Sequence, residues 1–170
     1  MKASKVKEAA LTAERLRELF DYDPSIGVFI RKVDRRGKGA VKGAIAGTDN
    51  GRGYTCISID GFNYRAHRLA YLYMLDRWPT DEVDHMNGCR SDNRWSNLRE
   101  LSTQKNTQNQ RKPHRHNSTG YLGVKFYGGK FRAVINVEGR RIFLGVHPSA
   151  EAAHAAYVAA KQTLHSSCTI

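Results

Sequence analysis

The adjacent pair Asp84-His85 is the part of the chain whose residue types best suit chemistry on a phosphodiester. Hydrolysis of such a bond needs an activated water, neutralisation of charge on the phosphoryl oxygens, and help for the departing oxygen. An imidazole with an ordinary pKa of about 6.5 is largely neutral near pH 7, so it can accept the proton of the water. We assign this role of general base to His85.

Two further side chains, a carboxylate and an amide, carry oxygen atoms of the kind that bind metal ions. Mg²⁺ and Mn²⁺ prefer oxygen ligands, so one carboxylate, one amide oxygen, the scissile phosphate and several waters can suffice. Asp84 and Asn106 fit these requirements, which predicts one divalent metal ion. Cys56, Cys89 and Cys168 are widely spaced and form no C-x-x-C pair, so we expect neither a structural zinc site nor a disulfide framework.

The elements around these residues must bring them to one place. Neighbouring side chains of a strand point to opposite faces, so Asp84-His85 can flank one phosphate only if the strand ends in a bend, which Asn87-Gly88 provides. Asp92-Asn93 is interpreted as a turn-forming scaffold. Ser102 is a suitable N-cap, which places Asn106 one turn into a helix. We expect a strand, a loop, a second strand and a helix to deliver the site.

The same stretch resembles a known family. Val83 to Gly88, followed by Asp92 to Leu98 and Ser102 to Asn109, resembles the HNH nucleases of the ββα-metal group, in particular the phage-type homing endonucleases whose third motif position is Asn. The residues that carry the likeness are His85, Asn97 and Asn106, with Asp23-Pro24, Gly53-Tyr54 and His67-Arg68 upstream. The resemblance implies that Asn97 holds the loop carrying His85. For His67 and Arg68 two roles stay open, support of the catalytic groups and helix packing.

The net charge indicates a polyanionic partner. The 170 residues include 28 Lys and Arg against 16 Asp and Glu, for a formal charge of +12 and a pI near 9.9. Double-stranded DNA is the first candidate and an anionic membrane the alternative. The sequence contains no run of about 18 apolar residues and no signal-peptide core, which argues against the membrane. We expect an intracellular protein, and the phage-type resemblance implies the cytoplasm of a host bacterial cell.

Pro and Gly divide the first half of the chain into short elements. Residues Leu11 to Ile30 are expected to form a short helix, a turn at Asp23-Pro24-Ser25 and a strand from Val28. Residues Arg31 to Gly53 contain six glycines and are expected to form a loose loop, either a phosphate contact or a solvated connector. A hairpin from Tyr54 to Arg65 and a helix from Ala66 to Leu75 follow.

The second half is strongly basic. Residues 105 to 147 hold nine Lys or Arg and a single acid, Glu138, for a local charge of +8. Residues 108 to 117 are polar and interrupted by Pro113, which is typical of a linker. Ser149 is a suitable N-cap for an Ala-rich helix that ends near Leu164. Before it, three strands are expected at Leu122 to Tyr127, Lys130 to Val137 and Arg140 to Val146.

Strand alternation separates two faces of this small sheet. The apolar face, against the helix, is expected to hold Leu122, Val124, Phe126, Phe131, Ala133, Ile135, Val137, Ile142, Leu144 and Val146. The opposite face is expected to hold Tyr121, Lys125, Tyr127, Lys130, Arg132, Asn136, Arg141 and Phe143. Arg132 and Arg141 suit bidentate contacts with guanine, and Lys125 and Lys130 suit phosphates. The predicted DNA-contact residues are Lys125, Tyr127, Lys130, Arg132, Asn136, Arg140 and Arg141, with Arg111 and Lys112 in the linker.

This region resembles a second family. Ser118 to Val124, Lys130 to Ala133, Phe143-Leu144-Gly145 and the Ala-rich helix resemble the plant ethylene-response-factor type of DNA-binding domain. Positions that often hold Trp in the plant domains are Phe131 and Phe143 here. The resemblance implies a three-stranded sheet that binds DNA.

These features predict an α+β protein, with an N-terminal ββα-metal (HNH) nuclease domain followed by a small domain in which a three-stranded antiparallel sheet packs on one helix. The expected boundaries are 1–107 for the nuclease domain with its N-terminal extension, 108–117 for the linker and 118–170 for the DNA-binding domain. The predicted function is a sequence-targeting, metal-dependent, homing-type DNA endonuclease, monomeric, that nicks one strand. The alternatives are double-strand cleavage by a dimer, a non-catalytic DNA-binding regulator on an HNH scaffold, and an RNA-binding protein.

Overall fold

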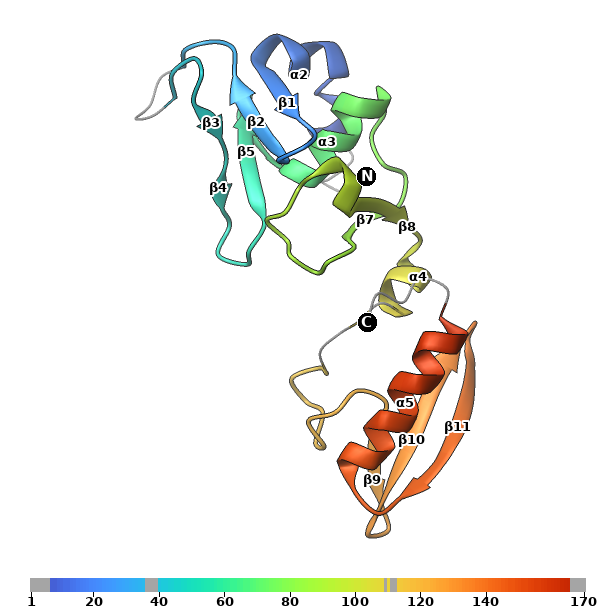
Figure 1. Ribbon diagram of the computed structural model, residues 1–170. Helices are drawn as coiled ribbons and strands as arrows, with labels where there is room; N and C mark the ends of the chain where they lie inside the picture. The colour runs from blue at the N-terminus through green and yellow to red at the C-terminus, as the bar shows by residue number, and fades with distance from the viewer. Residues whose placement is uncertain (1–6, 36–39, 109, 111–112, 166–170) are drawn as a thin grey trace. The chain divides into compact units, whose positions relative to one another are not determined.

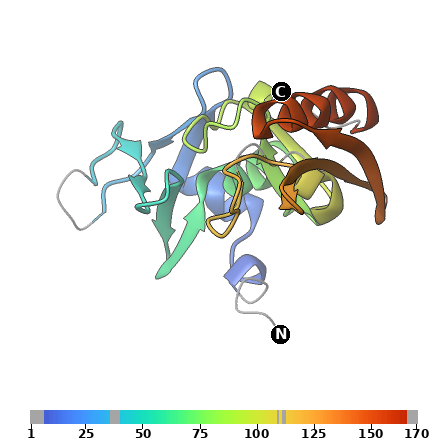
Figure 2. The same cartoon turned by 90° about the horizontal axis from the view of Figure 1, so that it is seen from below.

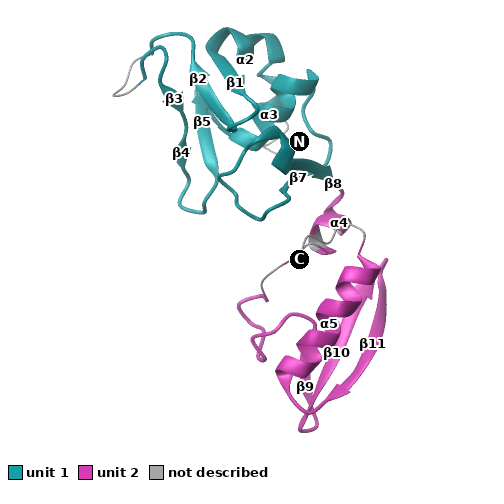
Figure 3. Cartoon of the chain, in the orientation of Figure 1, with its two compact units in different colours: residues 1–101 teal, residues 102–170 magenta. Residues whose placement is uncertain are grey.

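The computed structural model describes residues 7–35, 40–108, 110 and 113–165 and divides into two compact units, residues 1–101 (unit 1) and 102–170 (unit 2) (Figure 3). The division falls after Leu101, whereas the sequence placed a linker at 108–117. Arg111, Lys112 and Cys168, named from the sequence, lie outside the described residues. Among the helices described, none has the length and apolar character needed to cross a bilayer.

Unit 1 contains short strands around two helices (Figure 1). Its elements are α2 (Ala13–Leu19), β1 (Phe20–Asp23), β2 (Val28–Arg31), β3 (Ile45–Ala46), β4 (Thr48–Asp49), β5 (Thr55–Ile59), β6 (Phe62–Arg65), α3 (Ala66–Leu75), β7 (Glu82–His85), the 3-10 helix η1 (Trp95–Asn97) and β8 (Leu98–Leu101). The strands form antiparallel sheets in the orders β1-β2-β3, β4-β5-β6 and β7-β8. Together with unit 2, described below, they confirm the predicted α+β class.

The N-terminal segment is a helix followed by a hairpin rather than a helix, a turn and a single strand. Thr12 caps α2 by accepting a hydrogen bond from the backbone N–H of Arg15 at 3.1 Å. The chain then enters β1 directly, because Phe20 and Tyr22 alternate into the core and pair with β2. The predicted turn at Asp23-Pro24-Ser25 is confirmed as part of the connection between these strands.

The prediction of a loose loop from Arg31 to Gly53 is wrong in part, because the segment contains two short strands. Ile45–Ala46 pairs with β2 and Thr48–Asp49 pairs with β5, so the segment joins two sheets. Gly47 separates the pairs at φ +120°, and a Cβ there would lie 2.5 Å from Thr55 Cγ2. Glycine composition alone missed these strands, because their hydrogen-bond partners are distant in sequence.

The predicted hairpin and the helix after it are confirmed. β5 and β6 pair from Cys56–Arg65 to Ile59–Phe62, and the turn residues Asp60 and Gly61 have φ values of +47° and +85°. Two successive positive φ values suit a tight two-residue hairpin. α3 begins immediately at Ala66 and ends at Leu75, with Asp76 in a left-handed conformation.

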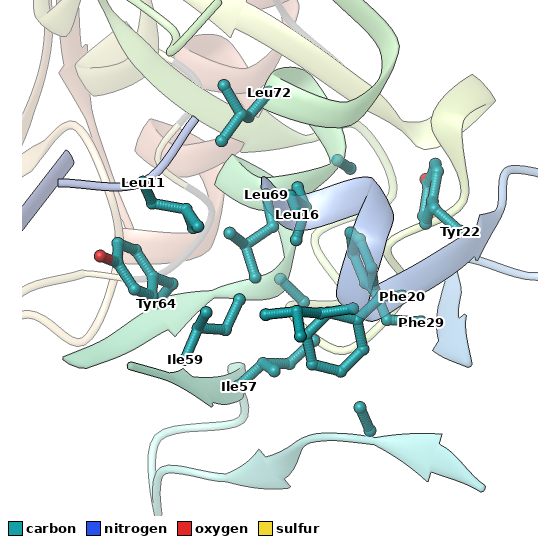
Figure 4. Packing of buried hydrophobic residues seen from close by; sticks show 14 of the residues in the cluster. Leu11, Leu16, Phe20, Tyr22, Phe29, Ile57, Ile59, Tyr64, Leu69 and Leu72 are labelled. Carbon is teal, nitrogen blue, oxygen red and sulfur yellow. The ribbon is translucent and has the colours of Figure 1, made fainter. Parts of the chain in front are cut away.

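The core of unit 1 joins the N-terminal helix and hairpin to β5 and α3 (Figure 4). Leu16, Phe20 and Phe29 are buried with Ile57 and Leu69 in one cluster. Burial of each large apolar side chain contributes about 1.5–3 kcal/mol, so the N-terminal segment stabilises the elements that precede β7.

Unit 2 is a three-stranded sheet covered on one face by a helix (Figures 1 and 2). Ser149 caps its long helix by accepting from the Ala152 N–H at 3.2 Å, as predicted. Val124, Ala133 and Ala153 are buried between sheet and helix. The elements are α4 (Thr103–Gln108), β9 (Val124–Tyr127), β10 (Lys130–Val137), β11 (Arg140–His147) and α5 (Ala150–Leu164), with strand order β11-β10-β9. The three strands and the closing helix are confirmed.

A bulge corrects the predicted faces of this sheet. The pairing moves from Ala133–Gly145 to Val134–Phe143, so β11 has one extra residue there and its alternation reverses. Val146 therefore pairs with Arg132 on the face away from the helix, not on the apolar face.

One further face assignment, that of Tyr121, and one predicted DNA-contact residue, Arg140, are also corrected. Tyr121 precedes β9 and packs on α5, with its hydroxyl donating to Glu151 at 3.0 Å, so it is not on the outer face. Arg140 pairs with Val137, which shares the alternation of Ala133, so it lies on the helix side of the sheet, although exposed.

Candidate active site

The strand pair β7–β8 holds the two adjacent candidate residues. Asp84 pairs with Arg99 and His85 with Leu98 across the ladder. The chain then turns, with the Gly88 N–H donating to the His85 carbonyl at 2.8 Å and Gly88 at φ +75°. This bend at Asn87-Gly88 is the one expected from the sequence.

The imidazole of His85 is buried and contacts Asn93. His85 is 4% exposed, and its Nε2 lies 3.2 Å from Asn93 Oδ1. The Asn93 amide donates through Nδ2 to the Ser91 carbonyl at 3.1 Å, which fixes Oδ1 as the atom facing the ring. A carbonyl oxygen only accepts, so neutral His85 carries its proton on Nε2 and keeps the lone pair on Nδ1.

The surroundings of His85 favour this neutral form. Burial lowers the pKa of His85, while the hydrogen bond to Asn93 acts in the opposite direction. The ring meets His67 edge to face at 5.0 Å between centroids. Burial, followed by the neighbouring His85, lowers the pKa of His67 to about 3, so that ring is also neutral at physiological pH.

Asn97 holds the loop between β7 and η1. Its Oδ1 accepts from the Asn87 N–H at 3.0 Å, and its Nδ2 donates to Asn87 Oδ1 at 3.0 Å and to the Asp92 carbonyl at 2.8 Å. Arg94 binds the Asp92 carboxylate and is the main cause that lowers the pKa of Asp92 to about 2. Asn97 thus contacts the loop that follows His85, and the residue that contacts the imidazole itself is Asn93.

The β1–β2 hairpin supports Asn93 from behind. The Tyr22 hydroxyl donates to the Asn93 carbonyl at 2.6 Å, and the Trp95 N–H donates to the Pro24 carbonyl at 3.0 Å. Gly27, at φ +74°, lies so close that a Cβ would be 2.3 Å from the Asn93 carbonyl carbon and 2.2 Å from the Arg94 nitrogen. The position of Asn93 therefore depends on a hairpin about seventy residues earlier in the chain.

The carboxylate of Asp84 is oriented by Arg99. Two guanidinium nitrogens, Nε and Nη2, donate to the same oxygen, Oδ2, at 3.1 and 2.9 Å. In the described part of the chain, no group of three or more His, Cys, Asp or Glu side chains has an arrangement able to hold a metal ion. Asp84 by itself offers a carboxylate oxygen next to the base, which is the donor type that a hard divalent cation prefers.

Asn106 belongs to α4 of unit 2. Its N–H donates to the Ser102 carbonyl at 2.9 Å, one turn into the helix as predicted. The structure thus brings Asp84, His85 and Asn97 together within unit 1, while Asn106 is described with unit 2.

The pair His67-Arg68 has two different settings. His67 contacts His85, as described above. Arg68 points elsewhere, because its guanidinium pairs with Glu8 at 3.0 Å and donates to the carbonyls of Pro79 and Asp81. It ties the N-terminal segment to the turn before β7.

Sequence comparison gives a family for part of the chain. Residues 64–108 match the profile of the family described as HNH endonuclease. We call residues 64–108, which are similar to this family over about a quarter of the chain, the HNH segment.

This HNH segment runs from β6 to α4 and so includes Asp84, His85, Asn97 and Asn106, which supports a nuclease role. A search of curated proteins finds no match to the chain. Among solved structures, the chain is similar to that described as "DNA binding and cleavage by the HNH homing endonuclease I-HmuI", with 18% identity, coverage of 79% of this chain and 75% of that chain, and a TM-score of 0.43.

Several site residues were not identified from the sequence. Asn93 was interpreted as a scaffold residue because Asp-Asn pairs are typical of turns, whereas here its amide meets the imidazole. The ring of Tyr54 lies 6.2 Å from that of His85, with the guanidinium groups of Arg65 and Arg90 over it. The Gly53-Tyr54 part of the family likeness was the one available signal for this cluster.

Six of the predicted DNA-contact residues of unit 2 share one exposed face, which does not include Arg140. Cross-strand pairs place Lys125 with Arg132, Tyr127 with Lys130, and Asn136 with Arg141. The Arg132 guanidinium lies 4.4 Å from the centre of the Tyr127 ring. We name Lys125, Tyr127, Lys130, Arg132, Asn136, Arg141, Phe143 and Val146 the outer face.

Proposed function

We propose that the protein is a metal-dependent DNA endonuclease of the homing type that cuts one strand at a targeted sequence. The observation that carries this proposal is the His85–Asn93 contact inside the HNH segment, because it leaves a neutral imidazole with Nδ1 as its accepting nitrogen. Asp84 lies next to it on β7, and a basic surface is present in the same chain.

His85 acts as the general base. Its Nε2–H is held by Asn93, so Nδ1 takes the proton of the attacking water. Asn93 is in turn held by Ser91 and Tyr22, which limits rotation of the ring. Asn97 keeps the loop after His85 closed, so β7 ends at the bend that follows the two catalytic side chains.

Asp84 and the amide oxygen of Asn106 would hold the metal ion. When bound, Mg²⁺ or Mn²⁺ neutralises charge on the phosphoryl and leaving oxygens. Arg99 orients the Asp84 carboxylate through Oδ2, which fixes the direction in which the group offers its oxygens. A carboxylate oxygen and an amide oxygen are donor types that such an ion prefers.

The outer face of unit 2 binds duplex DNA. Arg132 and Arg141 provide forked donors for guanine edges, and Lys125 and Lys130 provide charges for phosphates. In this proposal, unit 2 recognises the target sequence and the HNH segment cleaves the DNA. One active site per chain makes a nick by a monomer the direct product.

Cleavage of a supercoiled plasmid that carries a target fragment tests the proposal. With Mg²⁺ or Mn²⁺, the wild type should produce nicked circles, and His85→Ala should lower the rate by about 10²- to 10⁴-fold while DNA affinity stays nearly the same. His114→Ala, at an exposed histidine, serves as the matched control. Unchanged cleavage by His85→Ala would refute the assignment of the base.

The same assay separates the alternatives. Linear product without a nicked precursor would indicate double-strand cleavage by a dimer. Tight binding of duplex DNA without cleavage under any divalent metal would indicate a non-catalytic regulator. Preference for structured RNA over duplex DNA at matched salt would indicate that the ligand is RNA and not DNA.

A further inference from the structure

A cluster of two arginines on one tyrosine lies beside the proposed base. The guanidinium carbons of Arg65 and Arg90 are 4.6 and 4.8 Å from the centre of the Tyr54 ring. The three residues come from separate segments, before β5, at the end of β6 and after β7. Both arginines are exposed, and Tyr54 is half-buried.

These two arginines differ from most of those in unit 1. Arg15, Arg17, Arg68, Arg77, Arg94 and Arg99 each pair with a carboxylate. Arg65 and Arg90 have no carboxylate partner among the described residues; Arg90 instead donates to the Arg52 carbonyl at 3.1 Å. Their charges are therefore available to an external anion.

The cluster adjoins the catalytic groups. The Tyr54 ring is 5.5 Å from the ring of His67 and 6.2 Å from that of His85. A cation held here lies within one or two nucleotide spacings of a phosphate attacked beside His85, because successive phosphates of a strand are several ångströms apart.

We propose that Arg65 and Arg90, held on Tyr54, bind a backbone phosphate of the DNA strand next to the phosphate that is cut. Guanidinium groups match phosphate oxygens with forked donors, and stacking on an aromatic ring orients the fork before the ligand arrives. Pre-orientation reduces the side-chain entropy lost on binding. This inference rests on the proposed function, and it adds residues of unit 1 to the DNA contacts expected on unit 2.

Salt-dependent binding of a short non-specific DNA duplex to the full chain tests the phosphate contact. Loss of one phosphate contact should reduce the slope of log affinity against log salt by about 0.9, and the double variant Arg65→Gln/Arg90→Gln should bind roughly tenfold more weakly near 0.1 M salt. Arg35→Gln removes the same charge from a side chain already paired with Asp60, so its slope and affinity should match the wild type. An unchanged slope in the double variant would overturn the proposal.

Substitutions of Tyr54 distinguish the orienting effect of its ring from the charge of the two arginines. Tyr54→Phe retains the ring and should retain the wild-type slope, whereas Tyr54→Leu should weaken binding with both arginines present. If the cluster merely packs the loop after β7 onto β5, the double arginine variant will lose stability, seen by Trp fluorescence, without a change in salt slope, which also overturns the proposal.

Cleavage kinetics distinguish this inference from the proposed function. For a phosphate contact outside the reacting atoms, the double variant should raise KM more than it lowers kcat. A wild type that binds DNA but never cuts it would refute the nuclease activity. The salt-slope comparison would then still decide whether Arg65 and Arg90 bind a backbone phosphate. A wild type that binds no duplex would refute both.

Discussion

Unit 1 and unit 2 are both rich in arginine, but their side chains have different partners. In unit 1, Arg68 pairs with Glu8 and Arg99 with Asp84, and both contacts fix segments that lead to β7 or lie in it. In unit 2, Arg132 and Arg141 stand on an exposed face without a carboxylate partner among the described residues. The same residue type thus positions the backbone in one unit and supplies surface charge in the other.

The difference shows why net charge alone does not locate a DNA contact. An arginine paired with a carboxylate attracts a phosphate only weakly, because the two opposite charges nearly cancel at a distance. Salt screens the remaining field within a Debye length, about 8–10 Å at physiological salt. Arg65 and Arg90 depart from this pattern within unit 1, since their partner is an aromatic ring that leaves the charge intact.

The largest expected effect comes from Gly27, which has no room for a side chain beside the backbone of Asn93 and Arg94. Gly27→Ala should lower the unfolding free energy by about 3 kcal/mol and abolish cleavage, because a Cβ there overlaps the backbone at Asn93 and Arg94. Trp78 and Trp95, both in unit 1, report this loss by fluorescence during urea unfolding. Gly43→Ala, at φ +84° with nothing within 4 Å of the added Cβ, should cost only about 1 kcal/mol from strain. Equal losses in the two variants would show that the hairpin does not hold Asn93.

Acidification should weaken unit 1 in a defined window. The folded pKa of His67 is about 3 and that of His85 is also lowered, so below about pH 6.5 the unfolded chain takes up protons that the folded unit does not. Stability is fully present above that pH and falls as the pH decreases, by up to about 1.4 kcal/mol per pH unit for each histidine.

Urea unfolding followed by Trp fluorescence between pH 7.5 and 5 measures this slope. The carboxylates with pKa near 2, Asp92 and Glu100, act only at lower pH, because their unfolded values are about 4. His67→Phe removes one of the two histidines of unit 1 and should make the slope shallower. A flat profile for the wild type in this window would contradict the burial of neutral imidazoles.

The smallest expected effect is a loss of about 1.4 kcal/mol of DNA-binding free energy in unit 2, with no change in stability. Arg132→Gln should weaken binding of a cleavable target duplex roughly tenfold, because one forked contact to DNA is lost. Arg140→Gln is the matched control, since this exposed neighbour pairs with Val137 on the helix side of the sheet. If Arg140→Gln weakened binding as much as Arg132→Gln, the two faces of the sheet would not differ in DNA contact.

Elements set by local signals were predictable. The Asp60-Gly61 turn, the α3 boundaries and the Ser149 cap depend on residues within a few positions of each other, and each is found where expected. The sequence analysis missed the pairing of β3 and β4 and the bulge between Ala133 and Val134. These features depend on strands distant in the chain, and neither residue alternation nor strand propensity identifies such partners. The bulge moves Val146 to the outer face, which we propose to bind DNA.

For the site, the sequence by itself determined the adjacency of Asp84 and His85 and the bend after them, and the family resemblance implied that Asn97 holds the loop. Only the tertiary structure decided that Asn93 contacts the imidazole, that Gly27 and Tyr22 hold Asn93, and that two arginines share Tyr54. The physical reason is that a proton's position on an imidazole and the charge left on a guanidinium depend on burial and on the nearest partner. Those partners come from segments that lie far apart in the chain and meet only when it folds.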